Sequence, residues 1–377
     1  MTTSVPFLDL KAMHAEVAED VAEGFARVLR DTCFVGGPDV GAFETAFAAF
    51  SGRAHCVGTA NGTDAVELAL RAVGIGPGDE VIIPANTFIA TAEAVVRAGA
   101  QPVLAEVDPD TLLLDPDAVE AVLGPRTAAV VPVHLYGQIA PMARIQELAQ
   151  RHGLAVVEDA AQAQGALQDG RGIGSGSAVA ATSFYPGKNL GAYGDGGALL
   201  TDSAELADRM RMLGEHGSRR KYMHEILGFN SRLDTLQAVV LNAKLSRLEK
   251  WNEARRVAAA NYERLLSHLD LVTPATAEGN LHVWHLYAVR VEAELRDAVF
   301  AQMTSQGVGV GIHYPMPVHL HEAFAHLGKV AGDFPVAEEA SARMISLPMF
   351  PTLTATQQEL VASALGAALE VSVREAS

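Results

Sequence analysis

Short apolar runs alternate with amphipathic segments along the chain from residue 55 to residue 201, and this alternation limits the fold more than any other feature. Runs of about four to eight apolar residues are typical of buried strands, whereas apolar residues at helical spacing are typical of helices. Strands that alternate with helices form a mainly parallel sheet covered by helices on both faces. The sequence therefore predicts an α/β protein with seven strands, at 55–59, 81–85, 102–107, 128–135, 154–159, 180–184 and 197–201.

Further elements are expected on either side of these strands. Apolar residues recur at helical spacing over 13–30 and 40–50. After the last strand, the sequence predicts in order a long helix over 235–269, a strand over 282–291, a helix over 294–307, a strand over 308–315 and two more helices.

The long predicted helix separates two parts of different size. Everything before residue 250 belongs to the predicted sheet and its helices, and the elements after it form a second, smaller set. We therefore expect a large domain over 1–250 and a smaller C-terminal α/β domain over 251–377, hinged on the long helix.

The chain is acidic, with a formal net charge of −17 from 28 basic and 45 acidic residues. Such a surface repels nucleic acid and anionic lipid, so neither is an expected partner. An anionic ligand must therefore be held by a local cationic pocket. Two cysteines, Cys33 and Cys56, are too few for a disulfide framework, and no stretch has the pattern of a secretory signal or a membrane span. These features predict a cytoplasmic protein.

Residues 61–70, "NGTDAVELAL", place a turn directly before a predicted helix. Gly62 allows a tight turn, Thr63 supplies a hydroxyl, and the free N–H groups of the helix start can bind an anion. The alternative is ordinary capping of the helix by Thr63 or Asp64.

Residues 156–165, "VVEDAAQAQG", end a strand of valines in two carboxylates, Glu158 and Asp159. Side chains alternate along a strand, so the two carboxylates point to opposite sides. One could cap the following segment. The other would lie at the carboxyl end of a parallel strand, where ligands of such sheets bind, and a cation or protonated nitrogen should meet it there.

Residues 183–197, "SFYPGKNLGAYGDGG", place Lys188 in a glycine-rich turn directly after a predicted buried strand. A lysine in apolar surroundings loses affinity for its proton and becomes a nucleophile that can form a Schiff base with a carbonyl. The alternative is a surface lysine in a flexible loop, as most lysines are. The neighbouring glycines favour the first interpretation because they let the backbone approach a ligand closely.

These three stretches complement one another. An aldehyde cofactor with a phosphate and a basic ring nitrogen needs a lysine for the carbonyl, a helix start with hydroxyls for the phosphate, and a carboxylate for the nitrogen. Pyridoxal 5'-phosphate has all three groups. The pattern therefore predicts an enzyme that uses this cofactor.

The chain resembles the nucleotide-sugar aminotransferases of the DegT/DnrJ/EryC1/StrS type, which belong to the pyridoxal-phosphate enzymes of fold type I. The resemblance runs through "VPFLDL", "NGTDA", "TFIAT", "VHLYGQ", "VEDAAQAQGA", "SFYPGKNLGAYGDGG", "FNSRLDTLQA", "WHLYAVR", "IHYPMPVHL" and "SLPMFP". The stretch over 217–238 is most similar to the branch that acts on dTDP-linked 3-keto-6-deoxyhexoses. An aminotransferase for a keto-cyclitol or for a 4-keto-sugar nucleotide is the alternative within the family.

The resemblance implies a role for each matching residue. The catalytic residues would be Lys188, as the Schiff-base lysine, and Asp159, at the pyridine nitrogen. The other cofactor-binding residues would be Gly62, Thr63 and Ser183 at the phosphate, Phe88 stacked on the ring, Gln162 near the phenolic oxygen, and Asn230 at the phosphate of the neighbouring subunit's cofactor. The substrate-binding residues would be Tyr185, His313 and Tyr314 for the sugar, and Arg219, Lys221 and Tyr222 for its diphosphate.

The same resemblance implies glutamate as the amino donor, the pyridoxamine form of the cofactor as the intermediate carrier, and a homodimer with shared active sites. Some members carry histidine at the position of Lys188 and act as sugar dehydratases, so the lysine favours transamination. Asn86 departs from the Ser, Thr or His that relatives often carry there, which leaves one local contact in doubt.

Three competing interpretations are weaker. The glycine-rich stretch over 170–176 precedes a strand, whereas a dinucleotide-binding motif follows one. His319 and His321 form a poor metal site, because two histidines straddling a leucine are too few ligands. A non-catalytic regulator that binds the cofactor lacks support, because the chain has no added DNA-binding module or basic patch.

Overall fold

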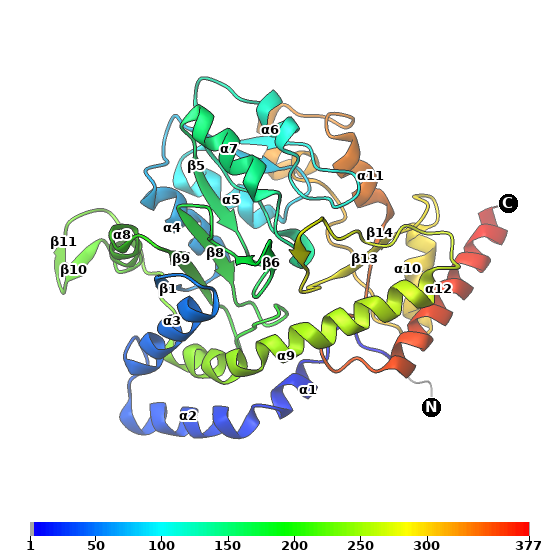
Figure 1. Ribbon diagram of the computed structural model, residues 1–377, viewed down its shortest axis with the longest axis horizontal. Coiled ribbons are helices and arrows are strands. Elements are labelled where there is room, and N and C mark those ends of the chain that lie inside the picture. The colour runs from blue at the N-terminus through cyan, green and yellow to red at the C-terminus, as the bar shows by residue number, and fades with distance from the viewer. Residues whose placement is uncertain (1–3, 377) are drawn as a thin grey trace.

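The computed structural model describes residues 4–376 and is built around a central seven-stranded sheet (Figure 1). The strand order is β1-β9-β8-β5-β4-β2-β3. These strands are β1 (His55–Thr59), β2 (Glu80–Pro84), β3 (Gln101–Ala105), β4 (Thr127–Val130), β5 (Ala155–Asp159), β8 (Val179–Ser183) and β9 (Gly197–Thr201). All seven strands predicted from the sequence are thus confirmed, with shifts of a few residues at their ends.

One strand of the sheet runs against the others. β9 pairs antiparallel with both β1 and β8, whereas β8, β5, β4, β2 and β3 pair parallel with their neighbours. The predicted mostly parallel sheet is therefore confirmed. Because the remaining strands share one direction, their carboxyl ends lie at one edge of the sheet, where ligands of such folds bind.

Helices cover both faces of the sheet. One face packs against α4 (Gly62–Ala72), α5 (Ile89–Ala98) and α8 (Ala204–Gly214), and the other against α3 (Pro38–Phe50), α6 (Pro116–Ala121), α7 (Met142–His152) and α9 (Thr235–Leu266). Strand residues alternate between the two cores: Val81 and Ile83 join the first and Ile82 joins the second. This alternation explains why the strands read as continuous apolar runs.

The C-terminal part has a core of its own, to which the second half of α9 contributes Tyr262 and Leu266. Figure 1 shows α9 extending from beside the sheet to α12. Its elements are β13 (Tyr287–Arg290), α10 (Arg296–Ser305), η2 (Val318–Leu320), η3 (Glu322–Leu327), α11 (Pro335–Arg343), β14 (Met344–Leu347) and α12 (Ala355–Ala376). The domain boundary near residue 250 stays a prediction.

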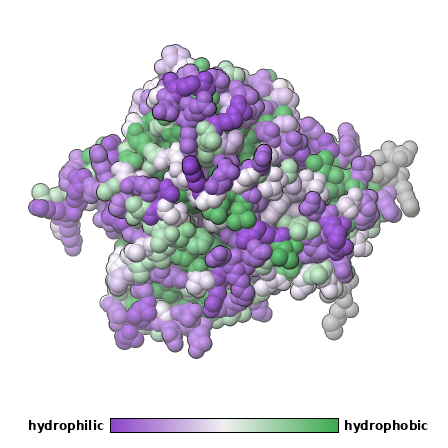
Figure 2. Space-filling model, viewed as in Figure 1, coloured by the Kyte–Doolittle hydropathy of each residue, from purple (hydrophilic) through white to green (hydrophobic). Residues whose placement is uncertain are grey.

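Short elements complete the described chain: η1 (Leu135–Gly137), β6 (Leu167–Gln168), β7 (Arg171–Gly172), β10 (Ser218–Arg220), β11 (Met223–His224) and β12 (Asn280–Leu281). Within residues 4–376, no helix combines the length and the apolar character that crossing a membrane requires. Hydrophilic residues cover most of the face shown in Figure 2, with small hydrophobic groups between them.

Two predicted elements differ in the structure. The helix expected over 13–30 is broken into α1 (Leu10–Ala15) and α2 (Ala18–Asp31), because Val17 leaves helical geometry and is buried against Val240 of α9. The strand expected over 308–315 is wrong: this segment makes only single bridges to Val5 and Ser346.

A physical reason for the second difference lies in the glycines of that segment. A side chain at Gly309 would meet the backbone of Phe7 at 2.5 Å, so the N-terminal segment lies directly against it. The partner of β13 is instead β14, which pairs with it antiparallel from Leu347 to Met344.

Candidate active site

A cavity of about 440 Å³ lies where the parallel strands end, within the usual size range of small-molecule sites. Its lining follows the carboxyl ends of β1, β2, β4, β5 and β8, together with residues of the C-terminal part. Ten of the residues predicted from the sequence share this cavity, namely Gly62, Thr63, Phe88, Asp159, Gln162, Ser183, Tyr185, Lys188, His313 and Tyr314.

Lys188 lies in the turn after β8, where its backbone N–H donates to the carbonyl of Tyr185 at 2.8 Å. Its side chain is partly buried and lines the cavity. Burial lowers the pKa of its ammonium from 10.5 to about 8, against the opposing effect of the negative charge of Asp159. About one tenth of this lysine is therefore the neutral, nucleophilic amine at pH 7, far more than at the ordinary pKa.

Asp159 ends β5 and is buried. Its Oδ2 accepts a hydrogen bond from the hydroxyl of Thr91 at 2.7 Å, and its Oδ1 accepts one from the N–H of Ala161 at 3.1 Å. This carboxylate therefore caps the following segment and also lines the cavity. The sequence analysis assigned capping to one of the two carboxylates, Glu158 or Asp159, and the place at the ligand-binding edge to the other. In the structure, Asp159 has both positions.

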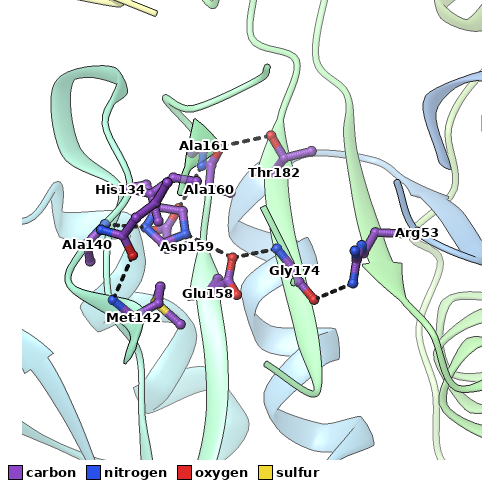
Figure 3. A network of polar contacts seen from close by, with 12 residues as sticks. Arg53, His134, Ala140, Met142, Glu158, Asp159, Ala160, Ala161, Gly174 and Thr182 are labelled. Carbon is purple, nitrogen blue, oxygen red and sulfur yellow. Dashed lines mark hydrogen bonds and ion pairs between the residues drawn. The ribbon is translucent and has the colours of Figure 1, made fainter. Parts of the chain in front are cut away.

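Glu158 points to the opposite side of the sheet, as strand alternation predicts. It accepts hydrogen bonds from His134 Nε2 at 2.9 Å and from the N–H of Gly174 at 2.6 Å, as Figure 3 shows. His134 uses its other ring nitrogen, Nδ1, to accept from the N–H of Ala140. Glu158 is therefore part of a buried polar network away from the cavity.

The start of α4 forms one wall of the cavity. Its N-cap is Asn61, whose side chain accepts from the N–H of Asp64 at 2.8 Å, so the alternative of capping by Thr63 or Asp64 is wrong. A Cβ at Gly62 would lie 2.6 Å from Cβ of Ser183, so only glycine lets α4 begin this close to the end of β8. The free N–H groups of the helix and the hydroxyls of Thr63 and Ser183 thus converge at the cavity, where they fit a phosphate.

Gln162 connects two tyrosines at the cavity wall. Its Oε1 accepts from the N–H of Tyr136 at 2.6 Å, and its Nε2 donates to the hydroxyl of Tyr314 at 3.1 Å. The ring of Tyr314 lies 5.0 Å from the ring of Phe88. Because Phe88 is 49% exposed although it lines the cavity, its ring is available to stack on a ligand.

His313 stacks on Phe7 with ring centroids 5.5 Å apart, and its Nδ1 lies 3.0 Å from the hydroxyl of Ser346. Burial and the nearby charge of Lys188 lower the pKa of His313 to about 4. The imidazole is therefore neutral at neutral pH and can exchange hydrogen bonds with an uncharged polar ligand.

Four predicted residues lie outside the cavity of their own chain: Arg219, Lys221, Tyr222 and Asn230. The first three belong to the β10–β11 hairpin and its turn, which extends away from the sheet beyond α8 (Figure 1). Arg219 forms ion pairs with Asp208 and Glu225. Asn230 is exposed and forms a backbone bridge with Glu215.

Several cavity residues were not singled out in the sequence, among them Phe7, Asn61, Thr87, Asp195 and His285. Phe7 and His285 belong to the motifs "VPFLDL" and "WHLYAVR", but nothing in those motifs marks them as facing a ligand.

The structure also shows the partners of Asn86, which departs from the family pattern, and of His319, which was considered as a metal ligand. Asn86 is buried, and its Nδ2 donates to the carbonyl of Leu112 at 2.9 Å. His319 does have a carboxylate partner, Glu338 at 2.9 Å, which the sequence spacing did not reveal. No group of three potential metal ligands occurs in the part of the chain that the structure describes.

The residues of the cavity fit pyridoxal phosphate. A lysine of lowered pKa, a buried carboxylate and a helix start with two hydroxyls match the carbonyl, the ring nitrogen and the phosphate of this molecule. On a seven-stranded sheet with this order and one reversed strand, they define a pyridoxal-phosphate enzyme of fold type I.

Comparisons with known proteins identify the family. The model of the DegT/DnrJ/EryC1/StrS aminotransferase family matches residues 15–366, and the chain belongs to this family. It is similar to the dTDP-3-amino-3,4,6-trideoxy-alpha-D-glucose transaminase of Streptomyces venezuelae, with 49% identity over 94% of each protein. It is also similar to the UDP-N-acetyl-3-dehydro-alpha-D-glucosamine 3-aminotransferase of Acidithiobacillus ferrooxidans, with 46% identity over 96% of this chain and 97% of that protein.

A solved structure agrees with this result. The crystal structure of S. venezuelae DesV in complex with a ketimine intermediate superimposes with a TM-score of 0.95 and 48% identity, covering 97% of this chain and 98% of that one. The protein is therefore a pyridoxal-phosphate-dependent aminotransferase, and the predicted fold, cofactor and enzyme class are confirmed.

Proposed function

We propose that this enzyme transfers the amino group of glutamate to the C3 ketone of a nucleotide-linked keto-sugar, and that the sugar is a dTDP-linked 3-keto-6-deoxyhexose. The product is a dTDP-3-amino sugar for a glycan or a natural product. The observation that carries this proposal is the 49% identity with a transaminase named for a dTDP-3-amino sugar. The relative named for a UDP-sugar is also named a 3-aminotransferase, which supports the same position on the sugar.

Within this proposal, the residues of the cavity divide the work. Bound pyridoxal phosphate supplies an electron sink for the bond that breaks at the donor's α-carbon. Lys188 would bind the carbonyl end of the cofactor and, when free, would move a proton from the donor's α-carbon to the former carbonyl carbon of the cofactor. Asp159 holds the proton of the ring nitrogen by its negative charge. Gly62, Thr63 and Ser183 bind the phosphate at the start of α4.

The remaining cavity residues orient the cofactor and the sugar. Gln162 contacts the phenolic side of the cofactor, and Phe88 stacks on its ring. Tyr185, which is 60% exposed, forms the sugar subsite with His313 and Tyr314. A neutral His313 suits an uncharged sugar hydroxyl, because it can accept or donate one hydrogen bond.

We further propose a homodimer with shared active sites. Both substrates are anionic, yet no arginine lines the cavity among the described residues, whose only lysine there is Lys188. Lys221 in the β10–β11 turn has no ion-pair partner among the described residues, and Tyr222 beside it is 82% exposed. In a dimer, this hairpin with Arg219 would bind the diphosphate at the partner's cavity, and Asn230 would bind the partner's cofactor phosphate. A cytoplasmic location stays a prediction from the cysteine content.

An assay with a panel of acceptors tests the substrate. The purified enzyme, loaded with pyridoxal phosphate and glutamate, is offered dTDP- and UDP-linked 3-keto-sugars, 4-keto-sugar nucleotides and keto-cyclitols. We expect the dTDP-3-keto-6-deoxyhexose to react with the highest kcat/KM. A preference for a 4-keto-sugar or a keto-cyclitol would overturn the substrate proposal, and binding of the cofactor without turnover of any acceptor would favour a regulator.

A mixing experiment tests the shared site. Lys188→Ala lacks the lysine, and Asn230→Asp sets a carboxylate against the phosphate, so each variant alone should be inactive. If Asn230 acts in the partner's site, a mixed dimer has one site with both defects and one with none, and activity returns. Confirmed subunit exchange without recovered activity would contradict the shared site, as would a monomer at working concentration.

A further inference from the structure

His285 lies in the segment before β13 and lines the same cavity as Lys188. The two residues are linked through Asn189, which follows Lys188 directly in the chain. Asn189 is buried, and its Oδ1 lies 3.2 Å from Nδ1 of His285. The backbone after the lysine is therefore tied to the ring of His285.

The hydrogen bonds of Asn189 fix the orientation of its amide. Its Nδ2 donates to the carbonyl of Val283 at 2.9 Å and to Oδ1 of Asn252 at 2.9 Å. Asn252 is fixed in turn, because its own Nδ2 donates to the carbonyl of Gln164 at 2.9 Å. Backbone carbonyls only accept hydrogen bonds, so neither amide can be reversed without a clash of two acceptors. An acceptor, Oδ1 of Asn189, must therefore face His285.

This arrangement decides where the proton of His285 lies. Because Nδ1 faces an acceptor, it must carry the proton and donate. Burial, with the nearby charge of Lys188, lowers the pKa of His285 well below its ordinary value, so the ring is neutral. The other nitrogen, Nε2, is then bare. It has no hydrogen-bond partner among the described residues, and it is not sealed off from solvent space, so it opens on the cavity.

We propose that His285 is a positioning residue for Lys188: its bare Nε2 accepts a hydrogen bond from the free amino group of Lys188 and holds that amine in the cavity. A lysine that alternates between binding the cofactor and moving a proton needs a fixed place when it is free. The accepting nitrogen must carry no proton. The bond to Asn189 places the proton of the neutral ring on Nδ1, and the lowered pKa of His285 keeps Nε2 without one. This inference rests on the proposed role of Lys188.

Two substitutions at His285 separate positioning from structure. His285→Asn keeps a donor near the place of Nδ1, so it preserves the bond to Asn189 and removes the acceptor at Nε2. His285→Gln places an amide oxygen near the position of Nε2 and loses the bond to Asn189. A matched control is His282→Asn, because His282 lies on the same segment outside the cavity and its Nδ1 only accepts from the N–H of Trp284.

The measurement is a single turnover of the cofactor-loaded enzyme with glutamate, with and without deuterium at the α-carbon. We expect the Asn variant to keep its melting temperature and cofactor affinity and to lose about tenfold to a hundredfold in the rate of proton transfer, with a full isotope effect. The Gln variant should retain most of the rate, and the His282→Asn control should be unchanged. A purely structural role predicts the opposite order, and a Gln variant no faster than the Asn variant would overturn the proposal.

Spectra of the wild-type enzyme test the tautomer without any variant that has to stay active. In protein with ¹⁵N-labelled histidine, the His285 signal, assigned by its loss in His285→Gln, should report a neutral ring protonated at Nδ1 throughout the neutral pH range. A proton on Nε2 would refute the proposal even if both variants are inactive. Borohydride reduction followed by peptide mapping distinguishes failure of the proposed function from failure of the proposed role of His285. Cofactor on another lysine would overturn the proposed function. If the cofactor is on Lys188, a negative result in the tests above contradicts only the role of His285.

Discussion

Asp159→Asn removes the buried carboxylate whose negative charge acts on the ammonium of Lys188, while it preserves the shape of the side chain. Both carboxylate oxygens accept hydrogen bonds, one from Thr91 and one from Ala161. In the variant, the amide oxygen keeps one of these bonds. The amide N–H₂ can donate to Thr91, because the Thr91 hydroxyl can then donate to Thr87, 2.8 Å away. We therefore expect the variant to fold with a loss of about 1 kcal/mol, the net value of one hydrogen bond.

The effect on catalysis should be much larger than the effect on stability. In the proposed mechanism, the ring nitrogen of the cofactor would lose its proton without the carboxylate and could no longer draw electrons from the breaking bond. Removal of one preorganised electrostatic partner costs about 2.7–4 kcal/mol of barrier, or roughly a hundredfold to a thousandfold in rate. The same change should lower the pKa of Lys188 further below about 8, because the charge of Asp159 now raises it against the effect of burial.

Single-turnover kinetics with glutamate measure the effect on catalysis, and thermal unfolding measures the effect on stability. Glu158→Gln is the matched control, because this neighbouring carboxylate is also buried but bonds to His134 and Gly174 on the other side of the sheet. It should destabilise the fold by about 1–3 kcal/mol and leave the rate per folded molecule nearly unchanged. A near-normal rate in Asp159→Asn, or an equal loss in Glu158→Gln, would refute the reasoning.

Three other outcomes are expected. Borohydride reduction of the cofactor-loaded enzyme should fix the cofactor to Lys188, and an adduct mapped to another lysine would contradict its role. The rate at which cofactor-free enzyme captures pyridoxal phosphate should rise with pH and level off above about 8, because only the neutral amine of Lys188 attacks; a rise that continues toward 10.5 would show that burial does not lower its pKa. Gly62→Ala should weaken cofactor binding, seen by titration, and destabilise the fold by about 1–3 kcal/mol, because the new methyl group would lie 2.6 Å from Cβ of Ser183; wild-type affinity would show that α4 can retreat from β8 without loss.

The strands of the sheet could be predicted from the sequence because burial on both faces requires a short continuous run of apolar residues in each strand. Each strand is a short apolar run, and each run turned out to be a strand. The helix over 13–30 and the strand over 308–315 failed for a different reason, since their outcome depends on contacts made across the chain. Val17 breaks the helix because it packs on Val240, and Gly309 cannot join a ladder because the backbone of Phe7 lies against it.

The residues of the candidate site also fall into two groups: some are indicated by the local sequence, and others depend on contacts with distant parts of the chain. Lys188 and Asp159 could be predicted at the cavity because Asp159 ends one strand and Lys188 lies in the turn after another, and parallel strands bring their carboxyl ends to one edge. His285 was missed because its importance depends on the orientation of Asn189, which distant backbone carbonyls decide. The state of Arg219 was equally hidden, because a sequence does not show that Asp208 of α8 neutralises it.

The acidic character of the chain affects how anionic groups can bind at the cavity. An acidic chain that binds anionic substrates needs donors that do not depend on free cations, and the start of α4 provides them for one phosphate through N–H groups and hydroxyls. The described cavity offers no arginine for the glutamate carboxylates or the sugar diphosphate, and its one lysine is committed to the cofactor in the proposed mechanism. Arg219 is paired with two carboxylates, which a bound diphosphate would have to displace, whereas Lys221 has no ion-pair partner among residues 4–376. It extends from a hairpin that does not line the cavity of its own chain, so in the proposed homodimer a second copy of the protein would bring that charge to the site.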